Sequence, residues 1–247
     1  MKKVFLIPII TAVLLLMSNV KISAQDAVGI LQKVDQILNA PKDQKIMTTI
    51  TLYDKQSRQS LRTMSMVQKG SDKRLVKILS PADQKGIGFL SLPNDNLTVY
   101  LPAYGKTRKI SSSVKNSKFA GTDFTYEDME AKKYSQKWTP KLISATGEHF
   151  VLQLNLKDDV ISDYSQLIMY VRKSDNYPIK VEHFDKSGKL YKVLTDNNVV
   201  KTDGYQIAKE LVMEDKKSGT KTKMTVTSVT FDNGLKDDYF SERELIK

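Results

Sequence analysis

The chain has 247 residues, no cysteine and a formal net charge of +11. The absence of cysteine excludes a disulfide framework, a thiolate metal site, a cysteine nucleophile and a lipid-carrying cysteine after a signal sequence. The basic charge suits anionic lipid or an acidic protein as a partner, and it suits solubility alone equally well.

The first 24 residues have the form of a secretory signal peptide. Residues 1–3 are a short basic start, residues 4–17 are an apolar run, and a polar stretch ends at Ala24. The run is shorter than the roughly 20 apolar residues of a membrane span. We therefore expect cleavage after Ala24 and export to the periplasm, with an uncleaved anchor as the alternative. Removal of the segment's three lysines lowers the charge from +11 to +8 for residues 25–247, and export argues against nucleic acid as a partner.

An amphipathic helix opens the exported chain. Apolar residues recur at spacings of three and four from Ala27 to Leu38, which is one helical stripe. Pro41 ends the pattern. We expect this helix to lie as a lid over part of a sheet, because the stripe has to pack against another element.

The period then changes to two, which predicts strands to the end of the chain. Turn sequences such as those at 69–72 and 202–204 separate many of the runs and favour hairpins. Short connections imply antiparallel neighbours, so we predict a single domain over 25–247 built as a meander of about 11 to 13 strands. Such a meander must curl, split into two sheets or close. The runs are 45–54, 59–69, 73–80, 86–92, 96–102, 106–112, 138–145, 148–157, 163–173, 177–185, 188–198, 204–214 and 221–231.

Two strands are apolar on both faces, namely "RLVKIL" (74–79) and "LIMYV" (167–171). A strand of this kind is covered on both faces. We expect the opening helix to supply one cover. The other face holds either an apolar cavity or an ordinary sandwich core, and the pattern does not separate the two.

The acidic stretch "GTDFTYEDME" (121–130) raises the question of an active site. Thr125 followed by Asp128 resembles a capping box, and the charges suit a short helix over about 126–134. A catalytic or metal-binding carboxylate cluster is the weaker alternative. We expect Thr125→Ala to cost about 1 kcal/mol of stability, as lost caps do, and Asp128→Asn to cost less.

Other signs of chemistry are few. The chain has no nucleophile elbow, no P-loop and no dinucleotide-binding glycine motif. His149 and His183 lie far apart, without partners at metal or triad spacing. We predict no cofactor, no metal and no enzymatic activity, and an exported hydrolase stays as the least favoured reading.

One segment, 104–118, carries five cations and no acid. It is either a solvated loop or a contact with anionic headgroups or an acidic partner. The five candidate contact residues are Lys106, Arg108, Lys109, Lys115 and Lys118.

Two blocks of sequence resemble the outer-membrane lipoprotein-sorting proteins, in the LolA-like branch. They are "ILSPADQKGIGFLSLPNDNLTVYLPAYGKTRKISSS" (78–113) and "FAGTDFTYEDME" (119–130). The resemblance implies a mainly β (α+β) fold, an incomplete and strongly curved antiparallel barrel with helices across its open side. It also implies an apolar interior that receives acyl chains, and an arginine that helps to hold the lid. Arg74, at the start of a central strand, is the nearest position for that candidate lid contact.

We therefore interpret the chain as a monomeric periplasmic carrier of lipoprotein acyl chains or phospholipid, in transient contact with a membrane surface. Membrane transport proteins of either membrane would be its partners. The alternative is a sensor, or an accessory module of a membrane transporter, on the same fold. Alternate apolar side chains of neighbouring strands form the candidate cavity wall, although a one-residue slip would turn the other face inward. This wall is Met64, Met66, Val76, Ile78, Phe89, Val99, Leu101, Leu167, Met169 and Val171.

Overall fold

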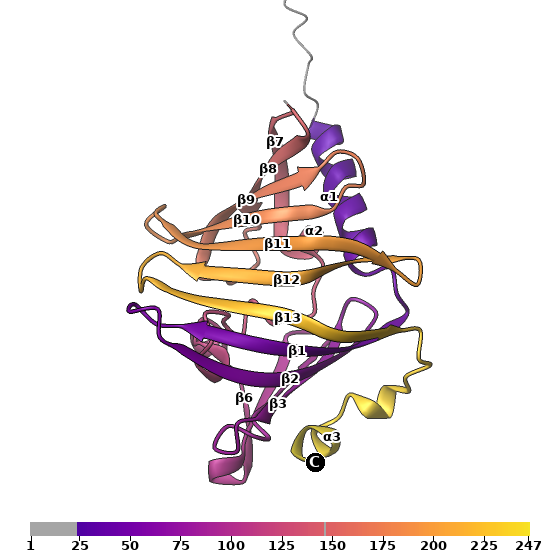
Figure 1. Cartoon of the computed structure of the whole chain (residues 1–247). Helices are drawn as coiled ribbons and strands as arrows, with labels where there is room; N and C mark the ends of the chain where they lie inside the picture. Colours follow the sequence, from indigo (N-terminus) through magenta and orange to yellow (C-terminus); the bar gives the residue numbers. More distant parts are fainter. Residues whose placement is uncertain (1–23, 146) are drawn as a thin grey trace, which may run out of the picture.

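The computed structural model describes residues 24–145 and 147–247, and the predicted signal peptide lies outside them apart from Ala24. Thirteen strands form one antiparallel sheet (Figure 1). Every run predicted from alternation overlaps one of these strands, and their number lies at the upper end of the expected range. They are β1 (Asp43–Tyr53), β2 (Gln59–Lys69), β3 (Lys73–Ser80), β4 (Gly88–Leu92), β5 (Asn96–Leu101), β6 (Lys106–Lys109), β7 (Trp138–Ser144), β8 (His149–Leu156), β9 (Tyr164–Arg172), β10 (Pro178–Asp185), β11 (Leu190–Thr202), β12 (Tyr205–Asp215) and β13 (Thr220–Phe231).

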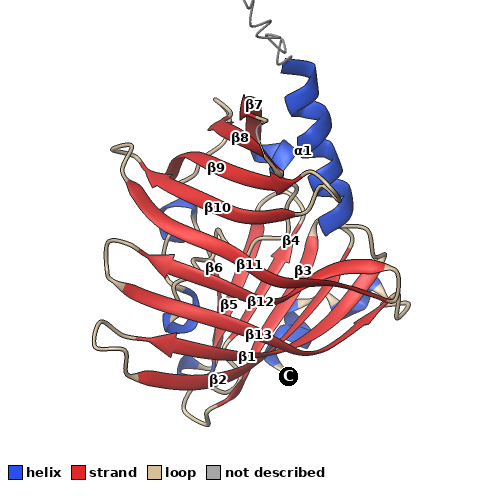
Figure 2. Cartoon of the chain, turned by 45° about the horizontal axis from the view of Figure 1, so that its top comes forward, coloured by secondary structure: helices blue, strands red, loops and turns tan. Residues whose placement is uncertain are grey.

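The order of the strands leaves the sheet open. Strands pair with their neighbours in the chain, and β1 pairs with both β2 and β13. This pairing joins the two halves of the chain and leaves β6 and β7, which follow each other in sequence, as the two edges. The predicted incomplete, curved barrel is confirmed, because the sheet curls without closing (Figure 2).

Helices cover parts of both faces. The α-helices are α1 (Ala24–Leu38), α2 (Tyr134–Lys137) and α3 (Glu242–Ile246), and short 3-10 turns lie at Pro102–Tyr104, Ser112–Val114, Phe119–Gly121 and Asp237–Tyr239. The apolar stripe of α1, including Leu31 and Val34, packs with Leu152, Leu167 and Met169 of β8 and β9. We call this the inner face of the sheet. Within the described residues, no helix is both long enough and apolar enough to cross a membrane.

The connection from β6 to β7, residues 110–137, lies over the inner face and is called here the crossing segment. Its first part forms a hairpin, in which the Tyr126 amide donates to the Ser117 carbonyl at 3.2 Å. The hairpin packs Phe119 and Tyr126 against Phe89 of β4, with ring centroids 6.2 and 5.7 Å from Phe89. This end of the inner face is therefore filled by the chain's own aromatic side chains.

The helix predicted over 126–134 is wrong. Residues 126–129 form a single turn, 130–133 are not helical, and α2 begins only at Tyr134. The cause is tertiary, because the Arg74 guanidinium donates to the carbonyls of Met129 and Glu130 at 3.0 and 3.4 Å. A continuing helix would need those two carbonyls for its own amides.

The outer face of "RLVKIL" is covered by the end of the chain, and not by the opening helix as predicted. Leu235, Phe240 and Leu245 pack there with Val67, Leu75 and Leu90. A Cβ on Gly88 would lie 2.6 Å from Leu245 Cδ1, so this glycine permits the close approach of α3. In "LIMYV" the outward residues are only half-buried, which is ordinary for the solvated face of an antiparallel sheet.

Candidate functional site

A cavity of about 330 Å³ lies between the inner face of the sheet and the elements that cover it. Its floor is supplied by β1, β2 and β9–β13. Its cover is the end of α1, at Asp35 and Leu38, together with the later part of the crossing segment, residues 127–137, which we call the roof. The volume falls within the roughly 300–1,000 Å³ of small-molecule sites.

The floor of the cavity is apolar and adaptable. It includes Ile46, Leu167, Leu194, Leu211 and Val226. Five of the chain's nine methionines line the cavity, among them Met213 and Met224 of the floor. A methionine side chain is flexible and polarizable, so it fits apolar partners of different shape. The wall can therefore accept an apolar chain without requiring one particular structure.

The ten residues predicted as the cavity wall all lie in the two apolar clusters of the inner face, but in different surroundings. Met64, Met66 and Leu167 line the cavity. Five others lie in the filled end, where the crossing segment packs over them; these are Val76, Ile78, Phe89, Val99 and Leu101. Met169 and Val171 lie beneath α1. The structure thus brings three of the ten to the cavity, together with floor residues that the sequence did not single out.

The acids of the stretch 121–130 hold the crossing segment in place. The Asp128 side chain is 6% exposed, and it accepts hydrogen bonds from the Tyr164 hydroxyl at 2.8 Å and from Lys192 Nζ at 3.1 Å. The predicted capping box is present, since Thr125 N donates to Asp128 Oδ2 at 2.8 Å and Asp128 N to Thr125 Oγ1 at 3.2 Å. Burial opposes the charge on Asp128, but Lys192, His183 and these hydrogen bonds outweigh it and hold its pKa below the ordinary value.

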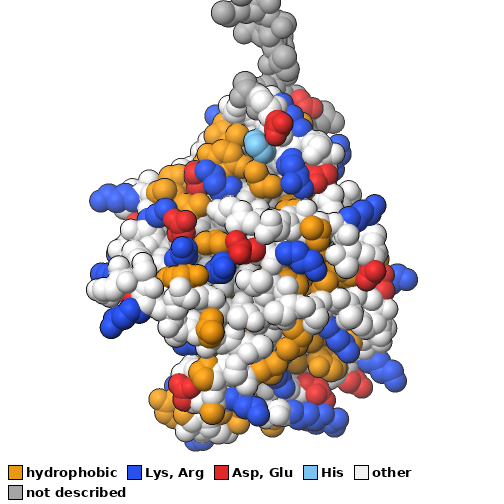
Figure 3. All heavy atoms as spheres, in the orientation of Figure 1, with side chains coloured by type: hydrophobic (Ala, Val, Ile, Leu, Met, Phe, Trp, Pro, Cys, Tyr) orange, Lys and Arg blue, Asp and Glu red, His pale blue; other side chains and the backbone are white. Residues whose placement is uncertain are grey.

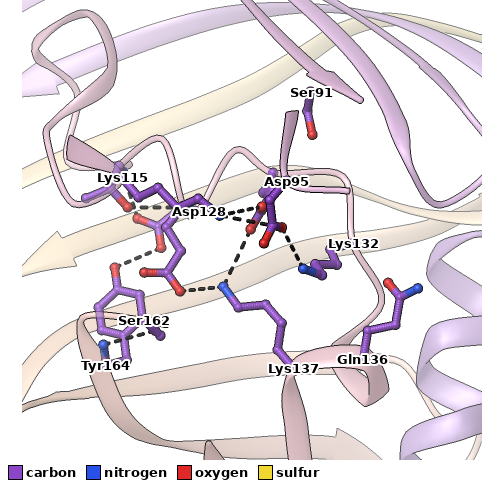
Figure 4. A network of polar contacts seen from close by, with 12 residues as sticks. Ser91, Asp95, Lys115, Asp128, Lys132, Gln136, Lys137, Ser162 and Tyr164 are labelled. Carbon is purple, nitrogen blue, oxygen red and sulfur yellow. Dashed lines mark hydrogen bonds and ion pairs between the residues drawn. The ribbon is translucent and has the colours of Figure 1, made fainter. Parts of the chain in front are cut away.

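Further ion pairs lie within the roof and join it to Lys115, earlier in the crossing segment (Figure 4). Glu127 is buried and pairs with Lys137 of α2. Glu130 lies 3.1 Å from Lys115 and 3.5 Å from Lys137. Glu127, Asp128 and Glu130 thus each have a lysine partner, which favours a structural role for the stretch. In the described part of the chain, no group of three or more acidic or histidine side chains is placed to hold a metal ion.

Arg74 joins the sheet to the roof. Besides its bonds to the roof carbonyls, its Nε and Nη2 donate to Gln68 Oε1 at 3.0 and 2.6 Å. Gln68 Nε2 in turn donates to Asn39 Oδ1, just after α1, at 3.3 Å. Burial lowers the Arg74 pKa to about 10, so the side chain stays cationic at neutral pH. This candidate lid contact therefore touches the crossing segment directly and is linked through Gln68 to Asn39, the residue after α1.

Three of the five predicted basic contact residues lie on the surface at the edge strand β6. Lys106 and Arg108 are exposed, and Arg108 lies over the Tyr104 ring at 5.4 Å. Lys109 is also exposed but pairs with Glu242 at 3.2 Å. On the face shown in Figure 3, Lys and Arg side chains are spread out and do not gather in one patch.

The other two predicted basic residues point to acids within the protein. Lys115 is buried against Glu130. Lys118 lies 2.7 Å from Asp123 and 3.1 Å from Asp215. The structure therefore does not bring the five cations together in a single surface.

The polar residues on the floor of the cavity were not predicted from the sequence, above all Asp196 of β11 and Tyr177, which precedes β10. Burial raises the pKa of Asp196 to about 7, although a hydrogen bond with Tyr177 opposes the shift. Asp196 lies opposite Leu211 on β12, so its side chain belongs to the inner face. The only sequence signal is an acid at an alternate position of a strand, and alternation alone could not say that this face is the inner one.

Comparison with known proteins agrees with this architecture. A model of a family described as "Uncharacterized protein" matches residues 70–247. No curated protein matches the sequence. An outer membrane lipoprotein-sorting protein domain from Vibrio parahaemolyticus is 27% identical and superimposes with a TM-score of 0.82, over 91% of this chain and 100% of that one.

Two further structures share the fold. A DUF1329 family protein from Desulfovibrio piger is 24% identical, with a TM-score of 0.83 over 90% of this chain and 98% of that one. A LolA superfamily protein from Nitrosomonas europaea is 22% identical, with a TM-score of 0.75 over 88% of this chain and 98% of that one. The predicted resemblance is confirmed: the chain belongs to the family whose model matches residues 70–247, and its fold is the LolA-like fold of lipoprotein-sorting proteins.

Proposed function

We propose that the protein is an exported carrier that binds an acyl chain of a lipoprotein or lipid in the cavity beneath the roof. The observation that carries the proposal is the apolar, methionine-rich floor of a cavity of about 330 Å³ in a LolA-like fold. Each buried methylene contributes about 0.8 kcal/mol, so ten would give roughly 8 kcal/mol before ordering costs. Burial alone is therefore sufficient for binding.

The size of the cavity limits the cargo. Its volume is near the lower end of the range for small-molecule sites, so we propose that it holds one chain with the roof in place. A cargo with several chains would need the roof to move away from the sheet. The bonds of Arg74 to the roof and the ion pair of Asp128 with Lys192 of β11 would have to break for that movement.

Two further features support a role in transport over a role in catalysis. The predicted signal peptide would deliver the chain to the periplasm, where lipids must cross an aqueous space. The acids of the stretch 121–130 are engaged with Lys137, Lys192 and other partners, and so are poorly placed to act on a substrate.

The test is native mass spectrometry of the protein purified from the periplasm without detergent, and after incubation with phospholipid vesicles. The wild type should carry a bound lipid. Leu211→Trp would fill the cavity and should abolish the lipid peak. Val212→Trp on the same strand is a matched control, because alternation places it on the outer face, and it should keep the lipid. A wild type that stays lipid-free in both preparations would defeat the carrier and favour the sensor or accessory-module alternative.

Contact with a membrane surface is the second part of the proposal, and it depends on the exposed cations of β6. Lys106→Gln with Arg108→Gln should weaken flotation with phosphatidylglycerol vesicles at low salt, because each cation near an anionic surface contributes about 1 kcal/mol. The control is Lys186→Gln with Lys201→Gln, which removes the same charge from exposed sites elsewhere. Equal flotation of the two double variants would rule out β6 as the contact.

A further inference from the structure

Polar side-chain atoms that lack a hydrogen-bond partner gather in the cavity. Among the described residues there are five such buried atoms, in Arg62, Glu130, His183, Asp196 and Gln206. All but Arg62 belong to residues that line the cavity, and Glu130 has its ion pairs. Folded proteins leave few buried polar atoms without a partner. Their concentration in one cavity indicates that its ligand supplies hydrogen bonds as well as apolar surface.

Asp196 is the most informative of these residues because it is an acid without a cation. Its carboxylate lies near Tyr177, whose hydroxyl oxygen accepts from the Ala208 amide at 3.1 Å. Asp196 Oδ1 has no hydrogen-bond partner. No lysine, arginine or histidine of the described chain forms an ion pair with it, whereas the roof acids Glu127, Asp128 and Glu130 each have a lysine.

Gln206 presents a second acceptor. Its Nε2 donates to Asp175 Oδ2 at 3.3 Å, which leaves Oε1 as the free end of the amide. Gln206 pairs with Lys201, five residues along β11 from Asp196, so its acceptor lies apart from the carboxylate. The complement of the Asp196 carboxylate is a donor that carries positive charge. His183 is different, since burial, aided by Lys192, lowers its pKa despite the opposing Asp128. A neutral imidazole can donate or accept and does not select between ligands.

The apolar floor runs directly from this polar corner. Asp196 pairs with Leu211 on β12, and Leu211 pairs with Met224 on β13. Neighbouring strands lie about 4.8 Å apart, so an apolar lane crosses the sheet at right angles to the strands, with the acid at one end. An extended alkyl chain along this lane would place its headgroup at Asp196.

On the basis of the proposed carrier function, we propose that Asp196 binds the ammonium group of an amine-bearing acyl lipid, whose chain lies over Leu211 and Met224. The ammonium would donate to Asp196 Oδ1. The apolar lane would select for a chain, and the polar corner would select for the headgroup.

The test is isothermal titration calorimetry at pH 8 with three single-chain probes below their aggregation limits: dodecylamine, dodecanoate and dodecanol. We expect the wild type to bind dodecylamine at least about tenfold more tightly than dodecanoate, which is the size of effect that one charge-assisted contact gives. Asp196→Asn should bring the two affinities to within about twofold and leave the affinity for dodecanol unchanged. Asp203→Asn, in an exposed turn, removes the same charge and should keep the preference.

The outcomes separate this inference from the carrier function. Binding of all three probes with equal affinity, or a preference for the amine that survives in Asp196→Asn, would overturn the ammonium site and leave the carrier standing. Failure of the wild type to bind any of the three chains would overturn both. The preference of the wild type is itself a test, and it does not depend on the folding of any variant.

Discussion

The inner face of the sheet has two ends that the same crossing segment covers in different ways. Over β3–β5 its hairpin inserts Phe119 and Tyr126, which pack edge to face with ring centroids 5.9 Å apart in the apolar cluster. Over β11–β13 it lies above the sheet, and a cavity of about 330 Å³ remains. The difference follows from the sequence of the segment, since 119–126 contains three aromatic residues whereas 127–133 is "EDMEAKK".

Charged side chains make a roof without filling the space beneath it. A carboxylate or an ammonium cannot enter an apolar floor without a large desolvation cost, so these side chains pair with one another at the level of the roof. Glu127 and Glu130 both pair with Lys137 in this way. A cavity in this fold is therefore produced by the composition of the cover as much as by the curvature of the sheet.

The largest expected effect comes from opening a cavity at the filled end. Phe119 is fully buried, so Phe119→Ala should cost about 4 kcal/mol of unfolding free energy, as buried aromatic truncations do. Leu211 lines the existing cavity and is half-buried. Leu211→Ala should cost only about 1 kcal/mol, because one side of this residue already lacks contacts.

Urea denaturation of both variants measures this contrast. A small cost for Phe119→Ala would mean that the hairpin can collapse into the space, and the filled end would then be no more rigid than the hollow one. Lipid binding by Phe119→Ala in the new space would mean that the filled end, too, can bind a ligand once its aromatic side chain is removed.

The second effect concerns the attachment of the crossing segment between the two ends. The Lys192 side chain is fully buried and pairs with Asp128. Asp128→Asn leaves that ammonium without a carboxylate, which should cost about 3 kcal/mol. Asp95→Asn is the matched control. Asp95 is 56% exposed where it pairs with Lys132, and such surface pairs contribute less than about 1 kcal/mol.

A double variant sharpens this prediction. Asp128→Asn combined with Lys192→Met removes the unpaired charge and should recover part of the stability lost in Asp128→Asn. If the single variant is as stable as the wild type, the carboxylate does not hold the crossing segment, and a functional role for the acidic stretch would regain support.

Asp128 also shows how far the sequence could predict the site. The pair of hydrogen bonds with Thr125 was predictable, because a capping box is a local pattern. The absence of the predicted helix after residue 129 was not predictable. Arg74, which lies 55 residues earlier in the chain, donates to the Met129 carbonyl that a continuing helix would use. From the sequence alone, Asp128→Asn should cost less than Thr125→Ala, but the buried Lys192 is 64 residues away in the chain and reverses that order.

The strands were predictable for the same reason, since alternation and turn residues are local and each run led to a strand. The pairing of β1 with β13 and the division of the inner face into a filled and a hollow end are long-range properties. On β11, Val193 and Thr195 are the β-branched residues that favour a strand, whereas the inner face carries Lys192 and Asp196. A polarity pattern read from this strand would therefore assign the wrong face to the core.

The smallest expected effect is a dependence on pH that belongs to the hollow end alone. Burial raises the pKa of Asp196 to about 7 in the folded protein, whereas an aspartate in the unfolded chain has a pKa of about 3.9. Between these values the folded state holds a proton that the unfolded state has released. The contribution of Asp196 to stability therefore declines as the pH rises from about 4 to about 7, and the cost is fully present above pH 7.

Asp196→Asn has no proton to lose, so it should be about as stable as the wild type at pH 4 and more stable at pH 8. One pKa unit corresponds to about 1.4 kcal/mol, and water reaches this half-buried side chain, so we expect a gain of about 2 kcal/mol at pH 8 and not the full shift. The measurement is the difference in unfolding free energy between variant and wild type across pH, in which the titration of groups common to both cancels. Asp203→Asn should give a flat difference. A difference for Asp196→Asn that is equally flat would mean that water or a cation already binds the carboxylate. The polar groups on the floor of the cavity would then have partners, as the buried groups of the filled end do.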